Sequence, residues 1–172
     1  MILSGKEIIN RLNKDIFIEP YSEQQVNPNS YNLTLSNELM IYTEDVLDLK
    51  KNNKVEKITI PIEGFILYPD RIYLAKTVEY TKTYNLVPMI FGRSSLGRLG
   101  LFVHAAGLGD TGYCGVWTLQ LICTQPIRIY PGIKICQICY HTLLGQETDY
   151  CSEKYQNSKE IINSKFFSEI NT

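Results

Sequence analysis

Long apolar runs are missing from this sequence. No stretch reaches the roughly 18 uninterrupted apolar residues that a transmembrane helix needs. The opening residues, MILSGKEIIN, also lack the basic segment, apolar core and small-residue cleavage site of a secretory signal. We therefore expect a soluble, cytoplasmic protein.

An excess of charge of one sign is missing as well. The 172 residues include 17 Lys and Arg and 18 Asp and Glu, which gives a formal net charge of -1. A chain with this balance has no general attraction for polyanions, so we expect no nucleic-acid and no membrane partner. Any anion that it binds must be small and held by local geometry.

Cysteine is scarce, and its arrangement gives little support to a metal site. Five cysteines are present, and Cys114, Cys123, Cys136 and Cys139 fall in apolar, strand-like runs. The last two have CxxC spacing, which raises zinc or redox chemistry, but residues three apart on a strand point to opposite faces. No second CxxC and no histidine at zinc-finger spacing accompany them. We expect buried thiols that act as small hydrophobes.

Short β-rich runs between turn signals are abundant. They are KITIPI, GFILYP, RIYLAKTVEYT, LVPMIFG, GVWTLQLICT, PIRIYPG and KICQICYHTL. Their spacing of about ten residues, without helices between them, favours an antiparallel sandwich or barrel over a sheet of βαβ units. With 44% hydrophobic and 20% charged residues, the chain is predicted to be one mainly β domain over residues 1–172.

The two ends of the chain depart from this β pattern. Ser4, followed by Glu7 and an apolar run, predicts a capped short helix at the N-terminus. Residues 147–172 lose the alternation and become polar, so this tail is either disordered or a flap that orders over a ligand. The stretch DLKKNNKVEK is predicted to be a solvent loop.

The stretch FGRSSLGRLGL is the first that carries chemistry. Gly92 permits a close turn, Ser94 and Ser95 offer hydroxyls and an N-cap, and Arg93 and Arg98 supply guanidinium groups. Such a turn can hold phosphate. It is not a P-loop, because its second glycine is followed by Arg and Leu instead of Lys and then Ser or Thr. Spacing alone fits a capped turn with two solvated arginines equally well.

The stretch DTGYCGVWTLQ is the second. A turn containing glycine leads into a strand, with Asp110 at its head and Gln120 at its end. Alternation alone predicts that Gln120 faces solvent together with Val116 and Thr118.

Five segments in order resemble the dCTP deaminase and dUTPase superfamily over residues 3–165. They are IEPYSEQQVNPNSYNLTL, GFILYPDRIYLAKTVEYT, GRSSLGRLGLFVH with DTGYCG, YPGIKICQICYH, and KYQNSKE. The resemblance implies a distorted antiparallel β-barrel of the jelly-roll type, the β-clip of dUTPases. It also implies a tail that closes over the site, and a homotrimer with nucleotide sites between subunits.

The resemblance implies roles for individual residues. It assigns the triphosphate to Arg93, Ser94, Ser95 and Arg98, the pyrimidine edge to Thr118, Leu119 and Gln120, the closing tail to Lys154, Tyr155 and Ser158, and a further substrate contact to Ala106. Asp110 would meet the deoxyribose 3′-hydroxyl or orient water. Mg²⁺ would be held through the triphosphate, and the sequence lacks the zinc-deaminase pattern of H-x-E with P-C-x-x-C.

Some positions depart from the family pattern. Ser158 stands where many relatives carry Gln, and Gly109 replaces an aliphatic residue. The span from Arg98 to Asp110 is one residue short. We therefore expect a reshaped base-binding hairpin.

Gln120 stands at the position of the glutamate that the family's deaminases use as a base. A carboxamide cannot take up a proton near neutral pH. General-base catalysis contributes about 10² to 10⁴ in rate, so deamination of dCTP should be crippled. The amide can instead match uracil O4 and N3–H at once, although a flipped amide can read cytosine.

Three functions follow from these residues. The leading hypothesis is hydrolysis of dUTP to dUMP and pyrophosphate by a dUTP diphosphatase-like enzyme, in which Asp110 positions the attacking water. The alternative is a dCTP deaminase that makes dUTP, including a bifunctional form. The third is a non-catalytic protein that binds or sequesters a pyrimidine nucleotide.

Overall fold

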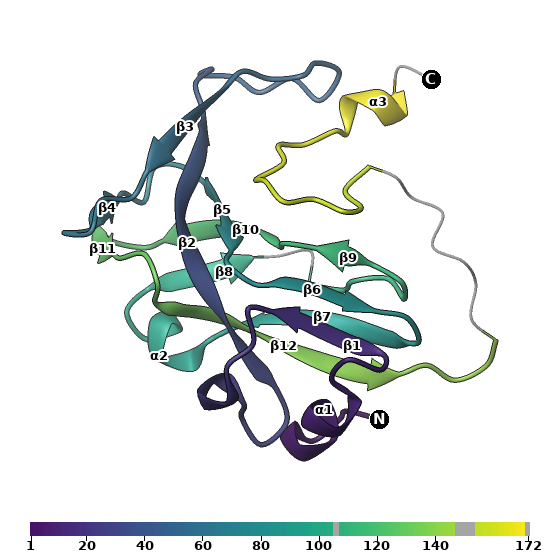
Figure 1. Ribbon diagram of the computed structural model, residues 1–172. Helices are drawn as coiled ribbons and strands as arrows, with labels where there is room; N and C mark the ends of the chain where they lie inside the picture. Colours follow the sequence, from purple (N-terminus) through teal and green to yellow (C-terminus); the bar gives the residue numbers. More distant parts are fainter. Residues whose placement is uncertain (105–106, 147–153, 171–172) are drawn as a thin grey trace.

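The computed structural model describes residues 1–104, 107–146 and 154–170 (Figure 1). The elements, in chain order, are α1 (Gly5–Arg11), β1 (Ile16–Glu19), η1 (Glu23–Gln25), β2 (Tyr31–Tyr42), β3 (Val55–Thr59), β4 (Phe65–Leu67), β5 (Tyr73–Thr77), β6 (Tyr80–Thr83), β7 (Leu86–Gly92), α2 (Ser94–Gly97), β8 (Leu101–His104), β9 (Cys114–Gly115), β10 (Thr118–Cys123), β11 (Ile127–Ile129), β12 (Lys134–Thr142) and α3 (Phe167–Ile170). None of the helices within these ranges has the length and hydrophobicity of a membrane span.

The strands form a nearly closed antiparallel barrel. The main sheet has the order β7-β12-β2-β5-β10-β8, with β3 paired to β2. Its two edge strands, β7 and β8, contact each other and almost complete the circle. Smaller sheets, β1-β6-β9 and β4-β11, extend it. The predicted mainly β, antiparallel barrel is therefore confirmed.

Strict alternation of buried and half-buried residues separates the core side of β10 from its outer side. Leu119 and Leu121 are 0% exposed and belong to the main hydrophobic core. Thr118 and Gln120, on the opposite face, are half-buried. Each fully buried leucine contributes about 1.5–3 kcal/mol relative to an exposed one.

The N-terminal helix forms where the sequence predicts it. The Ser4 side chain accepts a hydrogen bond from Glu7 N at 3.2 Å, which caps α1. The Glu7 carboxylate accepts from Arg11 Nε at 2.8 Å, one turn further along. Ile8 is buried and packs this helix against the barrel.

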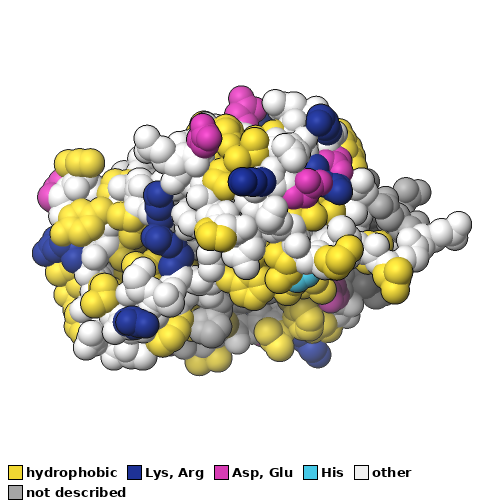
Figure 2. All heavy atoms as spheres, turned by 90° about the horizontal axis from the view of Figure 1, so that it is seen from below, with side chains coloured by type: hydrophobic (Ala, Val, Ile, Leu, Met, Phe, Trp, Pro, Cys, Tyr) yellow, Lys and Arg dark blue, Asp and Glu magenta, His cyan; other side chains and the backbone are white. Residues whose placement is uncertain are grey.

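The cysteines of the described residues are buried free thiols, as predicted. Burial raises the pKa of the Cys136 and Cys139 thiols, which keeps them protonated. In residues 1–104, 107–146 and 154–170, no group of three or more His, Cys, Asp or Glu side chains could hold a metal ion. Figure 2 shows Lys and Arg intermixed with Asp and Glu on one face, in line with the balanced net charge.

The described part of the tail, residues 154–170, lies against the barrel (Figure 1). Asn157 N donates to Cys114 O, and Val116 N donates to Ser158 O, both at 2.9 Å. Ile161 is buried in a small apolar cluster with Met40 and Leu74. The tail thereby becomes one wall of a cavity.

Candidate functional site

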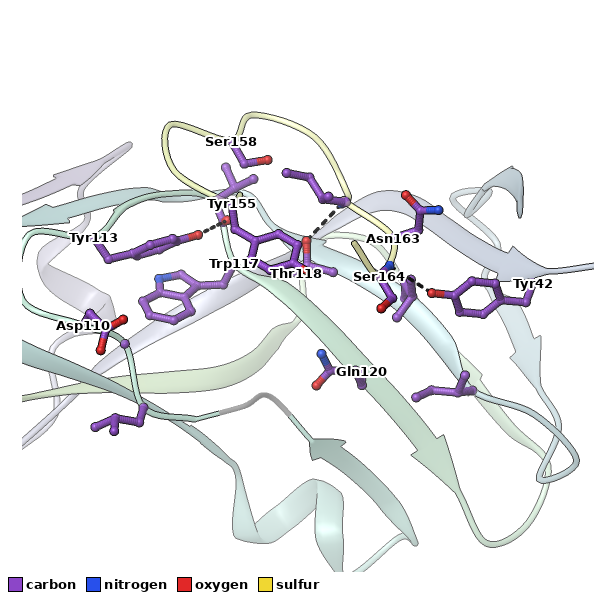
Figure 3. A pocket seen from close by; sticks show the side chains of 16 residues that line it. Tyr42, Asp110, Tyr113, Trp117, Thr118, Gln120, Tyr155, Ser158, Asn163 and Ser164 are labelled. Carbon is purple, nitrogen blue, oxygen red and sulfur yellow. Dashed lines mark hydrogen bonds between the residues drawn. The ribbon is translucent and has the colours of Figure 1, made fainter. Parts of the chain in front are cut away.

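A cavity of about 470 Å³ lies between the outer face of β10, the turn before β9 and the docked tail (Figure 3). Its size falls in the range of small-molecule sites. It is lined by Tyr42, Ile72, Leu74, Leu108, Gly109, Asp110, Tyr113, Val116, Trp117, Thr118, Gln120, Tyr155, Ser158, Ile162, Asn163 and Ser164.

Strand β10 supplies the floor of this cavity. It pairs with β5 on one side and with β8 on the other, so its backbone is held along both edges. Thr118 and Gln120 share the face that points into the cavity (Figure 3). The alternation of the sequence correctly predicts that Thr118 and Gln120 lie on the same face of β10. That face is covered by the tail, whereas the sequence predicted that it is open to solvent. Val116, predicted to be on the solvent side, is buried at 7% exposure.

The two polar side chains of β10 differ in how they are held. Thr118 Oγ1 accepts from Ile162 N of the tail at 3.2 Å, which leaves its O–H free to donate into the cavity. The Gln120 carboxamide forms no hydrogen bond to another described residue. Its donor and its acceptor are therefore both available to a ligand.

Asp110 opens the turn at one end of the cavity. Tyr113 N donates to Asp110 O at 3.1 Å. Gly112 has φ +87°, as the third position of a type II turn requires. Asp110 is exposed. Among the described residues that line the cavity, it is the one with a carboxylate.

Gly109 lies where a larger residue would not fit. A Cβ at this position would lie 2.5 Å from Trp117 Cη2 and 2.8 Å from Pro88 Cγ. The Trp117 indole is fixed in this space because its Nε1 donates to Thr81 Oγ1 at 2.8 Å. Its ring also packs against Tyr113, with the centroids 4.6 Å apart. The glycine at position 109 thus makes room for the Trp117 ring, while the reshaped hairpin expected from the sequence stays a prediction.

The tail residues singled out from the sequence occupy different environments. Tyr155 lines the cavity, and its hydroxyl accepts from Lys165 N at 3.0 Å. Ser158 also lines it, but its hydroxyl donates to Glu160 O at 2.7 Å. Lys154 Nζ forms an ion pair with Glu169 at 2.7 Å and lies outside the lining.

The predicted phosphate-binding turn lies apart from this cavity. Arg93, Ser94, Ser95 and Arg98 sit at the junction of β7 and α2, and none of them lines the cavity. The predicted helical turn is present, but the prediction of a serine N-cap is wrong, because Arg93 holds the N-cap position. Arg93 Nη1 donates to Lys134 O at 3.0 Å, while Arg98 is exposed.

Two further residues, Leu119 and Ala106, were predicted to bind substrate. The Leu119 side chain lies in the core, so only its backbone could contact a ligand in the cavity. Ala106 lies outside the described residues.

Residues that sequence reasoning did not single out complete the lining. Tyr113 and Trp117 form an aromatic wall at the Asp110 end. Tyr42 lies at the other end, and its hydroxyl accepts from Ser164 N at 3.1 Å. The one signal available in advance was compositional, since Trp117 is the single tryptophan of the chain.

Comparisons with known proteins agree on the family. The model of the family described as dCTP deaminase-like matches residues 2–143. A protein of Hathewaya histolytica named "dCTP deaminase, dUMP-forming" is 61% identical over 171 residues, which cover 99% of each chain. A Clostridium acetobutylicum protein of the same name is 58% identical over 94% of each chain.

The fold also matches a solved structure. The 2′-deoxycytidine 5′-triphosphate deaminase of Agrobacterium tumefaciens is similar over 82% of this chain, with a TM-score of 0.66 and 19% identity. This chain spans about half of that longer one, 48% of its length. The family model and the relatives together lead to one assignment: the chain belongs to the dCTP deaminase-like family.

Proposed function

We propose that this protein is an enzyme that forms dUMP from pyrimidine deoxynucleoside triphosphates. Its relatives are named dUMP-forming dCTP deaminases, which supports the bifunctional alternative better than hydrolysis of dUTP alone. One observation carries the proposal from the structure. Asp110, Thr118 and Gln120 converge on a single cavity that the tail covers.

In the proposed complex, the pyrimidine edge lies against the outer face of β10. The Thr118 O–H and the carboxamide N–H groups of Gln120 can donate to the base, and the Gln120 carbonyl oxygen, which bonds no other described residue, can accept from it. Asp110, at the other side of the aromatic wall, accepts from the 3′-hydroxyl or orients a water molecule. The cavity polarity therefore suits an uncharged base and a sugar, with the triphosphate directed outward.

The triphosphate requires cations that this cavity does not have. Its described lining includes no Lys and no Arg, whereas Arg93 and Arg98 lie on the β7–α2 turn. We therefore propose a homotrimer in which the turn of a neighbouring copy completes each site. The mass in solution, measured by light scattering, tests this arrangement, and a fully active monomer would contradict it.

A magnesium ion fits this proposal only through the nucleotide. Asp110 is the single carboxylate in the described lining, and Mg²⁺ is commonly held by one or two carboxylates together with substrate phosphates. When bound, the ion would neutralise charge that develops on the phosphates. The residues of this chain would orient the nucleotide and the water.

Two reactions are needed to form dUMP from dCTP. In deamination, water adds to C4 of cytosine and ammonia leaves. In hydrolysis, water attacks the α-phosphorus and pyrophosphate leaves. The first reaction needs a proton acceptor near the base, and the Gln120 amide cannot be that group. This residue favours a second candidate function, the hydrolysis of dUTP without deamination.

A product assay distinguishes these functions. The purified protein is incubated with dCTP or dUTP and Mg²⁺, and ammonia, pyrophosphate and dUMP are measured. We expect pyrophosphate from dUTP and only slow release of ammonia from dCTP. Asp110→Asn should reduce pyrophosphate release by about 10² or more. Binding of both nucleotides without any product would instead support the non-catalytic hypothesis.

The contribution of the amide is tested by restoring the acid. Gln120→Glu should raise the rate of ammonia release from dCTP by about 10² to 10⁴, with Gln120→Ala as the control for loss of the amide. Rapid ammonia release by the parent protein, unchanged in Gln120→Ala, would show that another group acts as the base.

A further inference from the structure

Gln156 joins the tail to the turn that carries Asp110. Its Nε2 donates to Gly112 O at 2.9 Å, and its Oε1 accepts from Cys114 N at 2.9 Å. The two partners flank Tyr113, so the side chain satisfies backbone groups in the way that a neighbouring strand would. Gln156 itself does not line the cavity, although its neighbour Tyr155 does.

The turn is anchored at its other end by the barrel. Gly109 N donates to Pro88 O of β7 at 2.8 Å. Between these two anchors lie Asp110 and the residues of its turn. The backbone that carries the Asp110 carboxylate is therefore held by β7 on one side and by the tail on the other.

The residue next to Gln156 also binds the segment that follows the Asp110 turn. When the tail docks, the backbone after Asp110 is therefore held in place at the same time. Asn157 N donates to Cys114 O at 2.9 Å. Asn157 Oδ1 accepts from Cys114 Sγ at 2.9 Å and from Tyr80 Oη at 3.3 Å. Asn157 has φ +59°, a left-handed conformation that asparagine tolerates better than most residues. Burial and the neighbouring Cys114 raise the pKa of Tyr80 to about 12, so its hydroxyl remains a donor.

We propose that Gln156 is a positioning residue that couples docking of the tail to the placement of Asp110. The tail then does more than cover the nucleotide, because undocking it also releases the turn. In the enzyme proposed above, on which this inference rests, Asp110 is correctly placed only while Gln156 bridges Gly112 and Cys114.

Amide hydrogen exchange tests the bridge without any substrate. Gln156→Ala should accelerate exchange of the Cys114 amide, because that N–H loses its Gln156 acceptor. The matched control is Gln146→Ala, which removes an exposed glutamine side chain before the tail. Exchange at Cys114 that is equal in Gln156→Ala and in the parent overturns the inference.

Kinetics test whether Gln156 acts through Asp110. Gln156→Ala should lower kcat for pyrophosphate release from dUTP by about 10- to 100-fold, the scale of a small displacement of a catalytic group. In an Asp110→Asn background, the same substitution should change the single-turnover rate by less than about twofold. An equal loss in both backgrounds would mean that Gln156 acts independently of Asp110 and would overturn the inference.

The two proposals fail in different ways. If the parent protein converts neither dUTP nor dCTP, the proposed function fails, and hydrogen exchange alone decides the bridge. If the parent is active but Gln156→Ala has the kcat of the parent, the coupling fails and the proposed function stands.

Discussion

The barrel and the tail that lies on it are stabilised by different interactions. In the main sheet of the barrel, β12, β2, β5 and β10 are paired along both edges, and a continuous core of buried side chains lies behind them. The tail is held by hydrogen bonds, by Ile161, the one buried apolar side chain of its described residues, and by ion pairs of Glu160 with the exposed Lys57 and the largely buried Lys76. Exposed ion pairs contribute only about 0–1 kcal/mol. Because few of the described tail residues are buried, we expect the tail to open at a lower cost than unfolding of the barrel.

The largest loss of stability is expected from a substitution in the core of the barrel. Leu119→Ala should lower the free energy of unfolding by about 2–5 kcal/mol, because it leaves a cavity under β10. Urea denaturation measures this loss. Gln120→Ala, on the opposite face of the same strand, should change the free energy by only about 0.5 kcal/mol. Similar losses in the two variants would contradict the assignment of the two faces.

An intermediate loss of stability is expected from a substitution at Gly109, where the barrel borders the cavity. Gly109→Ala should cost about 1–3 kcal/mol, because the new methyl group overlaps the Trp117 ring. Emission from Trp117, the single tryptophan, should shift as the ring moves. Trp117→Phe removes the outer ring and should recover part of the loss in the double variant. A Gly109→Ala protein with unchanged stability and emission would show that the space is not limiting.

A smaller effect is expected in the tail. Thr118→Val removes the acceptor of Ile162 N and should weaken docking by about 1 kcal/mol. Limited proteolysis of the tail should become roughly fivefold faster, while unfolding of the barrel stays the same. Thr59→Val, at an exposed position of β3, is the control. Equal proteolysis in the two variants would show that this hydrogen bond does not hold the tail.

The smallest effect should depend on pH. Glu79 is only 3% exposed, and burial raises the pKa of its carboxyl although Thr34 N and Oγ1 donate to it. With a folded-state pKa above that of the unfolded chain, stability from this group is complete below the unfolded pKa and declines as the pH rises through the folded pKa. The parent should thus lose stability relative to Glu79→Gln as the pH rises above about 4, the pKa of an unperturbed glutamate.

Urea denaturation over this pH range measures the difference. Glu63→Gln provides a matched substitution at an exposed position. A Glu79→Gln protein whose advantage shrinks as the pH rises would reverse the sign and contradict the effect of burial.

Patterns of residues close together in the sequence predicted several features of the fold. The Ser4 cap, the buried thiols and the alternation of β10 depend on residues close in sequence, and each is found in the structure. The prediction of a serine N-cap at the turn of Arg93–Arg98 was wrong because the helix begins earlier than the motif suggested, with Ser94 already inside it and Arg93 as the N-cap. Cap positions depend on backbone angles that a short motif does not specify.

The sequence predicted only part of the candidate site. Asp110, Thr118, Gln120 and Tyr155 were all singled out, and all line the cavity. The role of Gln156 was not found, because its partners lie more than 40 residues away, at Gly112 and Cys114. A pattern of types and spacings along the chain does not reveal such a pairing.

The sequence by itself determined which side of a strand such as β10 is apolar, and it placed at residue 120 an amide, which cannot take up a proton near neutral pH. These properties follow from a period of two along a strand and from the chemistry of one side chain. Only the tertiary structure decided that the polar side of β10 becomes the floor of a cavity. That outcome depends on a distant segment returning across the barrel, and such long-range docking is set by packing and hydrogen bonds between parts of the chain that are remote in sequence.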